Sequence, residues 1–156
     1  MVILGIDPGT ATTGYGIIRT QKNGRPVILA YGVISTNKIS SDAERLHVLA
    51  TDLQKLIKKY KPEKVGVEKL FFTTNQKTAM TVSQARGAIL LTCQQDGLTI
   101  FEFTPLQVKS IICGYGKASK QQVQYMVKHS FKLKILPKPD DAADALAIAL
   151  CAALTK

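Results

Sequence analysis

The fold is decided by Val2-Ile3-Leu4-Gly5-Ile6-Asp7-Pro8-Gly9-Thr10-Ala11-Thr12-Thr13-Gly14-Tyr15-Gly16, near the start of the chain. Five residues without a polar side chain run directly into an aspartate, which is typical of a central strand covered on both faces. Pro8 and Gly9 then turn the chain, so that the residues from Gly14 onward can return as the second strand of a hairpin. Asp7 therefore lies where the first strand leaves the core, at a sheet edge where ligands commonly bind, unless it only begins the turn.

Turn and helix signals divide the rest of the chain into strands and helices. Asn23-Gly24 predicts a second hairpin, and Ser41 with Glu44 predicts a capped helix that ends before Pro62. The expected strands cover about residues 2–7, 14–20, 26–36, 64–68 and 98–103. The further expected helices cover about residues 75–95, 105–112 and 120–131, and a last helix begins near residue 140.

The order of these elements determines where the strand ends lie. Two hairpins make the third strand parallel to the first, and a helical crossover makes the fourth strand parallel to the third. Asp7 and Glu68 therefore leave the sheet at the same end, and their carboxylates lie close together if the first and fourth strands are neighbours about 4.8 Å apart. The 156 residues are expected to form one α/β domain, residues 1–156, with a five-stranded mixed sheet flanked by helices.

Two further carboxylates lie in the first turns of the last expected helix. After Asp144 this helix is apolar all round and rich in alanine, which is typical of a helix buried against a sheet. Asp141 and Asp144 share one face of the helix, with Cβ atoms about 5–6 Å apart. Capping explains one or two of these aspartates, and Asp140 is interpreted as a cap. A carboxylate that enters an apolar helix, however, needs a compensating positive charge.

Four carboxylates can therefore meet at one pocket: Asp7, Glu68, Asp141 and Asp144. Like charges at such distances require a cation between them, either a nearby lysine or a divalent ion. Ligand sets made only of oxygen suit Mg²⁺ or Mn²⁺, and two such ions about 3.5–4 Å apart form the two-metal arrangement for phosphodiester hydrolysis. The sequence shows no Ser-His-Asp or Cys-His arrangement that would favour a covalent intermediate.

Charge is distributed unevenly along the chain. The formal net charge is +10, with 21 Lys and Arg against 11 Asp and Glu. Residues 69–139 contain ten basic and two acidic residues, and residues 105–139 contain no acid. A stretch of one sign this long favours a polyanionic partner such as nucleic acid. A basic chain that is merely kept soluble by its charge would not explain the clustering.

Cysteine usage and hydropathy indicate a reducing compartment. The three cysteines, Cys93, Cys113 and Cys151, are far apart and have no CxxC spacing, so ordinary thiols and no zinc site are expected. No apolar run is long enough to span a membrane, and no basic leader precedes the first apolar run. A cytoplasmic protein without a membrane partner is therefore expected.

Five motifs span nearly the whole chain in a characteristic order. They are Gly5-Ile6-Asp7-Pro8-Gly9, Thr13-Gly14-Tyr15-Gly16, Val67-Glu68 with Phe71, Ser83-Gln84-Ala85-Arg86-Gly87, and Asp141-Ala142-Ala143-Asp144-Ala145-Leu146-Ala147. Together they resemble the RuvC family of Holliday junction resolvases. The resemblance implies an RNase H-like fold, a homodimer, and Mg²⁺-dependent nicking of two strands, in a symmetrical pair, at a four-way DNA junction during recombination and repair.

The resemblance also implies roles for individual residues. The family's four metal-binding acidic positions, expected to hold two Mg²⁺ ions that Mn²⁺ can replace, fall on Asp7, Glu68, Asp141 and Asp144. Some members carry histidine where this chain has Asp141. Phe71 falls on an aromatic that stacks against bases at the junction. Lys109 and Lys120 fall on basic positions associated with DNA binding and catalysis. Lys77, Arg86 and Lys117, which belong to the same base-rich interval of the chain, are also expected to contact DNA. A branch-migration motor of the RuvAB type is a further expected partner.

Three other functions share parts of this pattern. Actin-like sugar kinases and ATPases also carry an Asp-x-Gly-Thr turn before a hairpin, but they need two such domains and a second phosphate loop, for which this chain has neither length nor motif. A related RNase H-like nuclease that acts on structured RNA stays open, because lysines and phosphates do not distinguish the sugar. A non-catalytic binding module is the third alternative, and it would not need four converging carboxylates.

Overall fold

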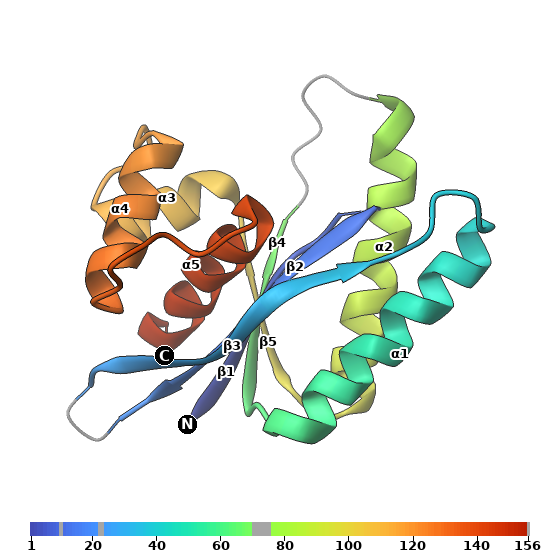
Figure 1. The fold of residues 1–156 in the computed structure, drawn as a ribbon, viewed down its shortest axis with the longest axis horizontal. Helices are drawn as coiled ribbons and strands as arrows, with labels where there is room; N and C mark the ends of the chain where they lie inside the picture. Colours follow the sequence, from blue (N-terminus) through green and yellow to red (C-terminus); the bar gives the residue numbers. More distant parts are fainter. Residues whose placement is uncertain (10, 22–23, 70–75, 156) are drawn as a thin grey trace.

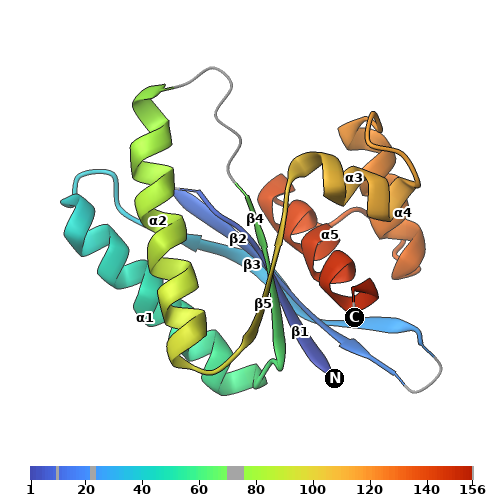
Figure 2. The same cartoon turned by 180° about the vertical axis from the view of Figure 1, so that it is seen from behind.

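Within the described residues, a five-stranded mixed sheet forms the middle layer of the protein (Figures 1 and 2). The structure, a computed structural model, describes residues 1–9, 11–21, 24–69 and 76–155, except for the side chains of residues 76–78. The strands are β1 (Val2–Asp7), β2 (Thr12–Thr20), β3 (Pro26–Ser35), β4 (Lys64–Glu68) and β5 (Thr99–Phe103), in the order β3-β2-β1-β4-β5. β1 pairs antiparallel with β2 and parallel with β4, which confirms that the first and fourth strands are neighbours.

Helices cover both faces of the sheet. The helices are α1 (Asp42–Tyr60), α2 (Gln76–Gln95), α3 (Pro105–Cys113), α4 (Lys120–Ser130) and α5 (Asp140–Leu154). α1 and α2 lie on one face, while α5 lies on the other with α3 and α4 packed against it (Figures 1 and 2). Ile3 of β1 packs with α5, and the next residue, Leu4, packs with α1 and α2. β1 is therefore buried on both faces, as its unbroken apolar run predicts. No helix in the described ranges is long and apolar enough to cross a membrane.

The element ends agree closely with the sequence signals, with two corrections. The capping box between Ser41 and Glu44 at the start of α1 is confirmed, since each side chain bonds the other residue's backbone N–H. β2 begins at residue 12 and not at 14, because Thr12 already pairs with the end of β3. Asp140 does not cap α5: the N-cap position belongs to Pro139, and no side chain there accepts a capping hydrogen bond.

Three glycines form the seat of α5 on the sheet. Gly16, Gly5 and Gly66 lie side by side on β2, β1 and β4. A Cβ at Gly5 would collide with the backbone of Ala145 and Ala149, and a Cβ at Gly16 or Gly66 would come within 2.9 Å of the helix. The alanine-rich helix can therefore approach the sheet closely, which brings its N-terminus to the edge where β1 and β4 end.

Gly5→Ala is expected to destabilise the protein by about 3 kcal/mol, because the added methyl group would overpack the contact between β1 and α5. Gly87→Ala is a matched control on α2, where an added Cβ meets no atom within 4 Å. It should raise the free energy of unfolding by about 0.5–1 kcal/mol through helix propensity. Urea unfolding measures both variants, and equal stabilities would contradict a close-packed seat for α5.

Candidate active site

Four carboxylates gather at the edge of the sheet where β1 and β4 end. Asp7 and Glu68 are the last residues of these two neighbouring parallel strands. Asp141 and Asp144 lie in the first turns of α5, which the glycine seat holds against the same edge. The charges of Glu68, Asp144 and Asp141 all act on Asp7. The structure therefore brings together the four acids that the sequence singled out.

Three of these acids, Asp7, Glu68 and Asp144, are half-buried and have pKa values raised above their ordinary values. Burial, followed by the negative charges of the other three acids, raises the pKa of Asp7 to about 8. Burial and the charge of Asp144 raise the pKa of Glu68 to about 7. Burial also raises the pKa of Asp144, although Lys120 opposes this shift. A pocket that disfavours its own negative charges is one that an added cation stabilises.

Lys120 supplies a positive charge to this pocket. Its Nζ lies 3.0 Å from Oδ2 of Asp144 and 3.3 Å from Oδ2 of Asp140. Burial lowers the pKa of Lys120, but its hydrogen bonds to these two aspartates outweigh that effect and raise it, so the ammonium stays charged. Lys120 is therefore the compensating charge that Asp144 was predicted to need. Asp140, interpreted from the sequence as a cap, is instead its second ion-pair partner.

Thr12 is a residue of this pocket that the sequence patterns did not single out. Its Oγ1 donates a hydrogen bond of 3.0 Å to Oδ2 of Asp141. The neighbouring Thr13 turns the other way and donates to the carbonyl oxygen of Gly9 at 3.0 Å, which braces the turn after β1. The threonine-rich turn was visible in the sequence, but which threonine would face α5 depends on the start of β2, which was predicted two residues too late.

Comparisons with known proteins agree with this architecture. Residues 3–152 match the family described as crossover junction endodeoxyribonuclease RuvC. The chain belongs to the RuvC family. A RuvC-family relative from Heliobacterium modesticaldum, a crossover junction endodeoxyribonuclease, is 54% identical over 153 residues, which cover 98% of this chain and 94% of the relative.

Solved structures of the RuvC family share the fold. Thermus thermophilus RuvC superposes with a TM-score of 0.91 at 34% identity, covering 97% of this chain and 92% of that chain. T. thermophilus RuvC in complex with a Holliday junction substrate gives a TM-score of 0.87 at 31% identity, with the same coverage. The predicted RNase H-like fold, with its mixed five-stranded sheet, is therefore confirmed within the described residues.

The basic residues expected to contact DNA occupy different environments in this RuvC-family protein. Lys117 is exposed in the turn before α4, and Lys109 is half-buried on α3. Both belong to the acid-free part of the chain, residues 105–139. Phe71 and the side chain of Lys77 lie outside the described residues.

The guanidinium of Arg86 is turned into the protein, in contrast to the exposed side chain of Lys117. Arg86 lies on α2 and forms an ion pair with Glu102 of β5. Its Nε also donates a hydrogen bond of 3.3 Å to the backbone carbonyl oxygen of Glu68. Both contacts lie inside the protein, and the DNA contact expected of Arg86 stays a prediction.

The residues of the pocket fit a divalent cation by their chemistry and charge. Four carboxylates supply the hard oxygen donors that Mg²⁺ and Mn²⁺ prefer, and the raised pKa values of Asp7 and Glu68 indicate negative charge that Lys120 alone does not balance. Among the residues that the structure describes, no three His, Cys, Asp or Glu side chains are already grouped as ligands of one ion. The fit therefore rests on the donor set and not on a preformed cage.

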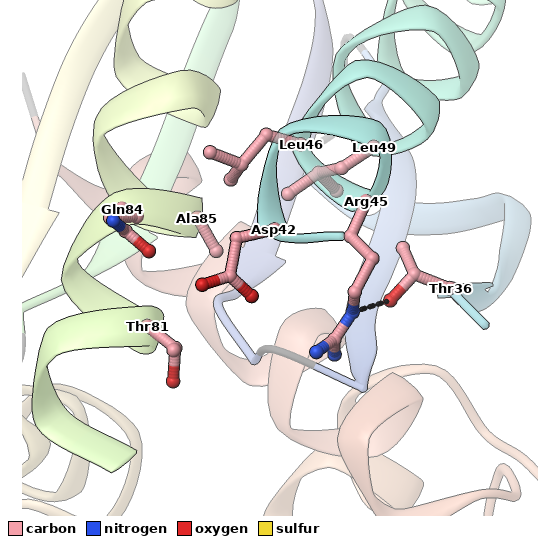
Figure 3. Close-up of a pocket in the computed structure, with 8 residues that line it drawn as sticks. All are labelled: Thr36, Asp42, Arg45, Leu46, Leu49, Thr81, Gln84 and Ala85. Atoms are coloured by element: carbon pink, nitrogen blue, oxygen red, sulfur yellow. Dashed lines mark hydrogen bonds between the residues drawn. The ribbon is translucent and has the colours of Figure 1, made fainter. Parts of the chain in front are cut away.

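A small cavity between α1 and α2 lies on the opposite face of the sheet (Figure 3). Its volume is about 20 Å³, room for no more than about one water molecule. Arg45 points toward Thr36 beside it and donates a hydrogen bond of 3.0 Å from Nε to Oγ1. Its lining residues are Thr36, Asp42, Arg45, Leu46, Leu49, Thr81, Gln84 and Ala85. The cavity is too small for a substrate, and none of the four acids lines it.

Proposed function

We propose that the protein is a divalent-metal-dependent endodeoxyribonuclease that resolves four-way DNA junctions by paired, symmetrical nicks. The observation that carries this proposal is the convergence of four carboxylates from β1, β4 and α5 at one sheet edge. Membership of the RuvC family supports the reaction class, since its relatives are described as crossover junction endodeoxyribonucleases. The complex of the T. thermophilus protein with a Holliday junction substrate supports the choice of DNA.

The metal would be held by the four acids, Asp7, Glu68, Asp141 and Asp144. The chemistry that two bound Mg²⁺ ions, or Mn²⁺ in their place, would supply there is activation of a water and stabilisation of the leaving oxygen. Thr12 orients one of these ligands, because its hydrogen bond occupies Oδ2 of Asp141 and leaves Oδ1 available. The products would carry 5′-phosphate and 3′-hydroxyl ends.

The lysines would hold the DNA. Lys120 already has its ammonium beside Asp144, so it would bind an oxygen of the phosphate that is cut. Lys109 and Lys117 would bind flanking phosphates, since they lie in a part of the chain without acids. Lys77 would add a further phosphate contact, and Phe71 would stack against bases at the crossover.

A homodimer is part of the proposal. A four-way junction is cut in two strands by symmetrical nicks, which requires two active sites related by a two-fold axis. A branch-migration motor of the RuvAB type would be a partner of this dimer on DNA. Light scattering of the purified protein at micromolar concentration measures the oligomeric state, and a monomer that still binds and cuts junctions in pairs would contradict it.

The test of function is cleavage of three labelled substrates: a mobile four-way DNA junction, a linear duplex of the same sequence, and a structured RNA. Each is incubated with the purified protein in Mg²⁺ and in EDTA. We expect paired nicks near the crossover of the junction in Mg²⁺ only. Cutting of RNA alone would favour the nuclease that acts on structured RNA, and binding without cutting would favour a binding module.

A further inference from the structure

We propose that Arg86 is a positioning residue for Glu68, and that it acts by fixing the end of β4 and not by binding DNA. This role rests on the proposed function, since it matters only if Glu68 holds a metal ion. Arg86 touches neither the carboxylate of Glu68 nor any other acid of the pocket in the contacts that the structure describes. Its effect would therefore pass through the backbone.

The first step of the argument is the position of Glu68 in the sheet. The pairing of β4 with β1 ends one residue earlier, at Val67, which lies opposite Ile6. On its other side, β4 stays paired with β5 through Glu68 and Phe103, and the N–H of Lys69 donates to the carbonyl oxygen of Phe103 at 2.7 Å. Among the described strands, therefore, only β5 pairs with the end of β4 that carries Glu68.

The second step is the hydrogen bond from α2. Arg86 Nε donates to the carbonyl oxygen of Glu68 at 3.3 Å. This bond ties the last residue of β4 to the helix that covers the face of the sheet opposite α5. It restrains the Glu68 backbone where β1 no longer does, and the direction of the Glu68 side chain depends on that backbone.

The third step is what holds Arg86 itself. Its guanidinium forms an ion pair with Glu102, which lies directly beside Val67 in the register of β4 and β5. The side chains of Arg86 and Glu102 are only 23% and 32% exposed. A planar guanidinium has donors on several edges, so it can reach a carboxylate and a carbonyl oxygen at once, which the single ammonium of lysine does less well.

The distribution of charge along the chain also bears on the role of the ion pair between Arg86 and Glu102. Glu102 is one of only two acids in residues 69–139, an interval with ten basic residues. Because Glu102 forms an ion pair with Arg86, the positive charge of this guanidinium is offset and adds less to the attraction of DNA. The pair is therefore explained by the geometry of the β4 end, and not by phosphate binding.

The experiment uses two conservative variants, Arg86→Lys and Glu102→Gln, in the full chain. Each variant keeps much of the size of the original side chain. Arg86→Lys loses the guanidinium, and Glu102→Gln loses the carboxylate that pairs with it. We expect each to raise about tenfold the Mg²⁺ concentration that gives half-maximal junction cleavage. A second readout without DNA is the Mg²⁺ concentration at the midpoint of the metal-induced rise in melting temperature, which should increase by a similar factor. Junction affinity measured in EDTA should stay within about twofold of wild type.

Lys109→Gln is the matched control, because it removes one positive charge from a proposed phosphate contact. It should weaken junction binding in EDTA and leave the Mg²⁺ midpoint of the thermal shift unchanged. The double variant with Arg86→Lys and Glu102→Gln should raise the Mg²⁺ midpoint by about as much as the single variant with the larger effect. The two effects do not add, because both residues act on one connected set of bonds.

Glu102→Gln separates the two possible roles of Arg86. If Arg86 binds DNA, freeing it from Glu102 leaves the Mg²⁺ midpoint at the wild-type value and tightens junction binding, and either result overturns the inference. Melting curves without metal check that each variant is folded, and Glu102→Gln remains decisive if Arg86→Lys is not. A wild-type protein that neither cuts junctions nor responds to Mg²⁺ would overturn the proposed function itself.

Discussion

Asp7→Asn is expected to reduce junction cleavage by about 1,000-fold or more, while junction affinity stays within about twofold of wild type. Asp7 is the acid on which the charges of the other three acids act, so it lies among them. Asparagine keeps the size of the side chain and one oxygen, but it removes the negative charge that would bind a divalent ion. Single-turnover cleavage in Mg²⁺ and gel-shift titration in EDTA measure the two quantities separately. Loss of binding together with cleavage would contradict a metal-ligand role.

The same substitution is expected to stabilise the metal-free protein in a way that depends on pH. The pKa of Asp7 is raised from 3.8 to about 8, so folding favours the protonated acid. Its destabilising effect therefore appears as the pH rises above 3.8 and grows until the pH reaches about 8. Asparagine does not ionise, so Asp7→Asn should gain several kcal/mol at pH 8 and almost nothing at pH 4.

Melting temperatures of both proteins in EDTA between pH 4 and pH 8 test this gain. Asp52→Asn is the control, since Asp52 lies on the surface of α1 in an ion pair with Lys55. It should change neither cleavage nor the pH dependence of stability, because an exposed pair contributes little. A gain for Asp7→Asn that is the same at every pH would contradict the raised pKa. Opposite demands of stability and metal binding on one residue are a common feature of active sites.

That Asp7 and Glu68 leave the sheet at the same end could be predicted from the sequence, because few topologies satisfy its local signals. An unbroken apolar run required a strand covered on both faces. Two hairpins and one helical crossover then set the directions of the first, third and fourth strands. The alanine-rich stretch after Asp144 likewise required a buried helix. These inferences use neighbours in the chain or the period of one element, so they do not depend on how side chains pack across the molecule.

The charge partners inside the site could not be predicted in the same way. Lys120 and Asp144 come from different helices, and their contact exists because α3 and α4 pack against α5. Arg86 and Glu102 appeared in the sequence as one of ten bases and one of two acids, and only the packing of α2 over β5 pairs them. Asp140 was misinterpreted for the same reason. The local pattern predicted a helix cap, but the side chain instead pairs with Lys120 from another helix.

Lys120→Met is expected to lower junction cleavage by about 100-fold and to destabilise the metal-free protein at pH 8. Methionine keeps the apolar stem and removes the ammonium, which lies 3.0 Å from Asp144 and lowers the pKa of Asp7 and Glu68. Because the pKa of Lys120 is raised in the folded protein, its stabilising contribution is complete below the ordinary value of 10.5 and is present at pH 8. Single-turnover cleavage and melting in EDTA measure the two effects.

Lys117→Met is the matched control, since Lys117 is exposed three residues earlier in the chain. It should weaken junction binding and reduce the slope of log affinity against log salt by about 1, without changing stability. Lys120→Met and Asp7→Asn should move the stability of the metal-free protein in opposite directions, because one removes a positive charge and the other a negative charge from the same pocket. Shifts of the same sign would mean that packing, and not charge, controls this pocket, and the argument for a cation among the four acids would then fail.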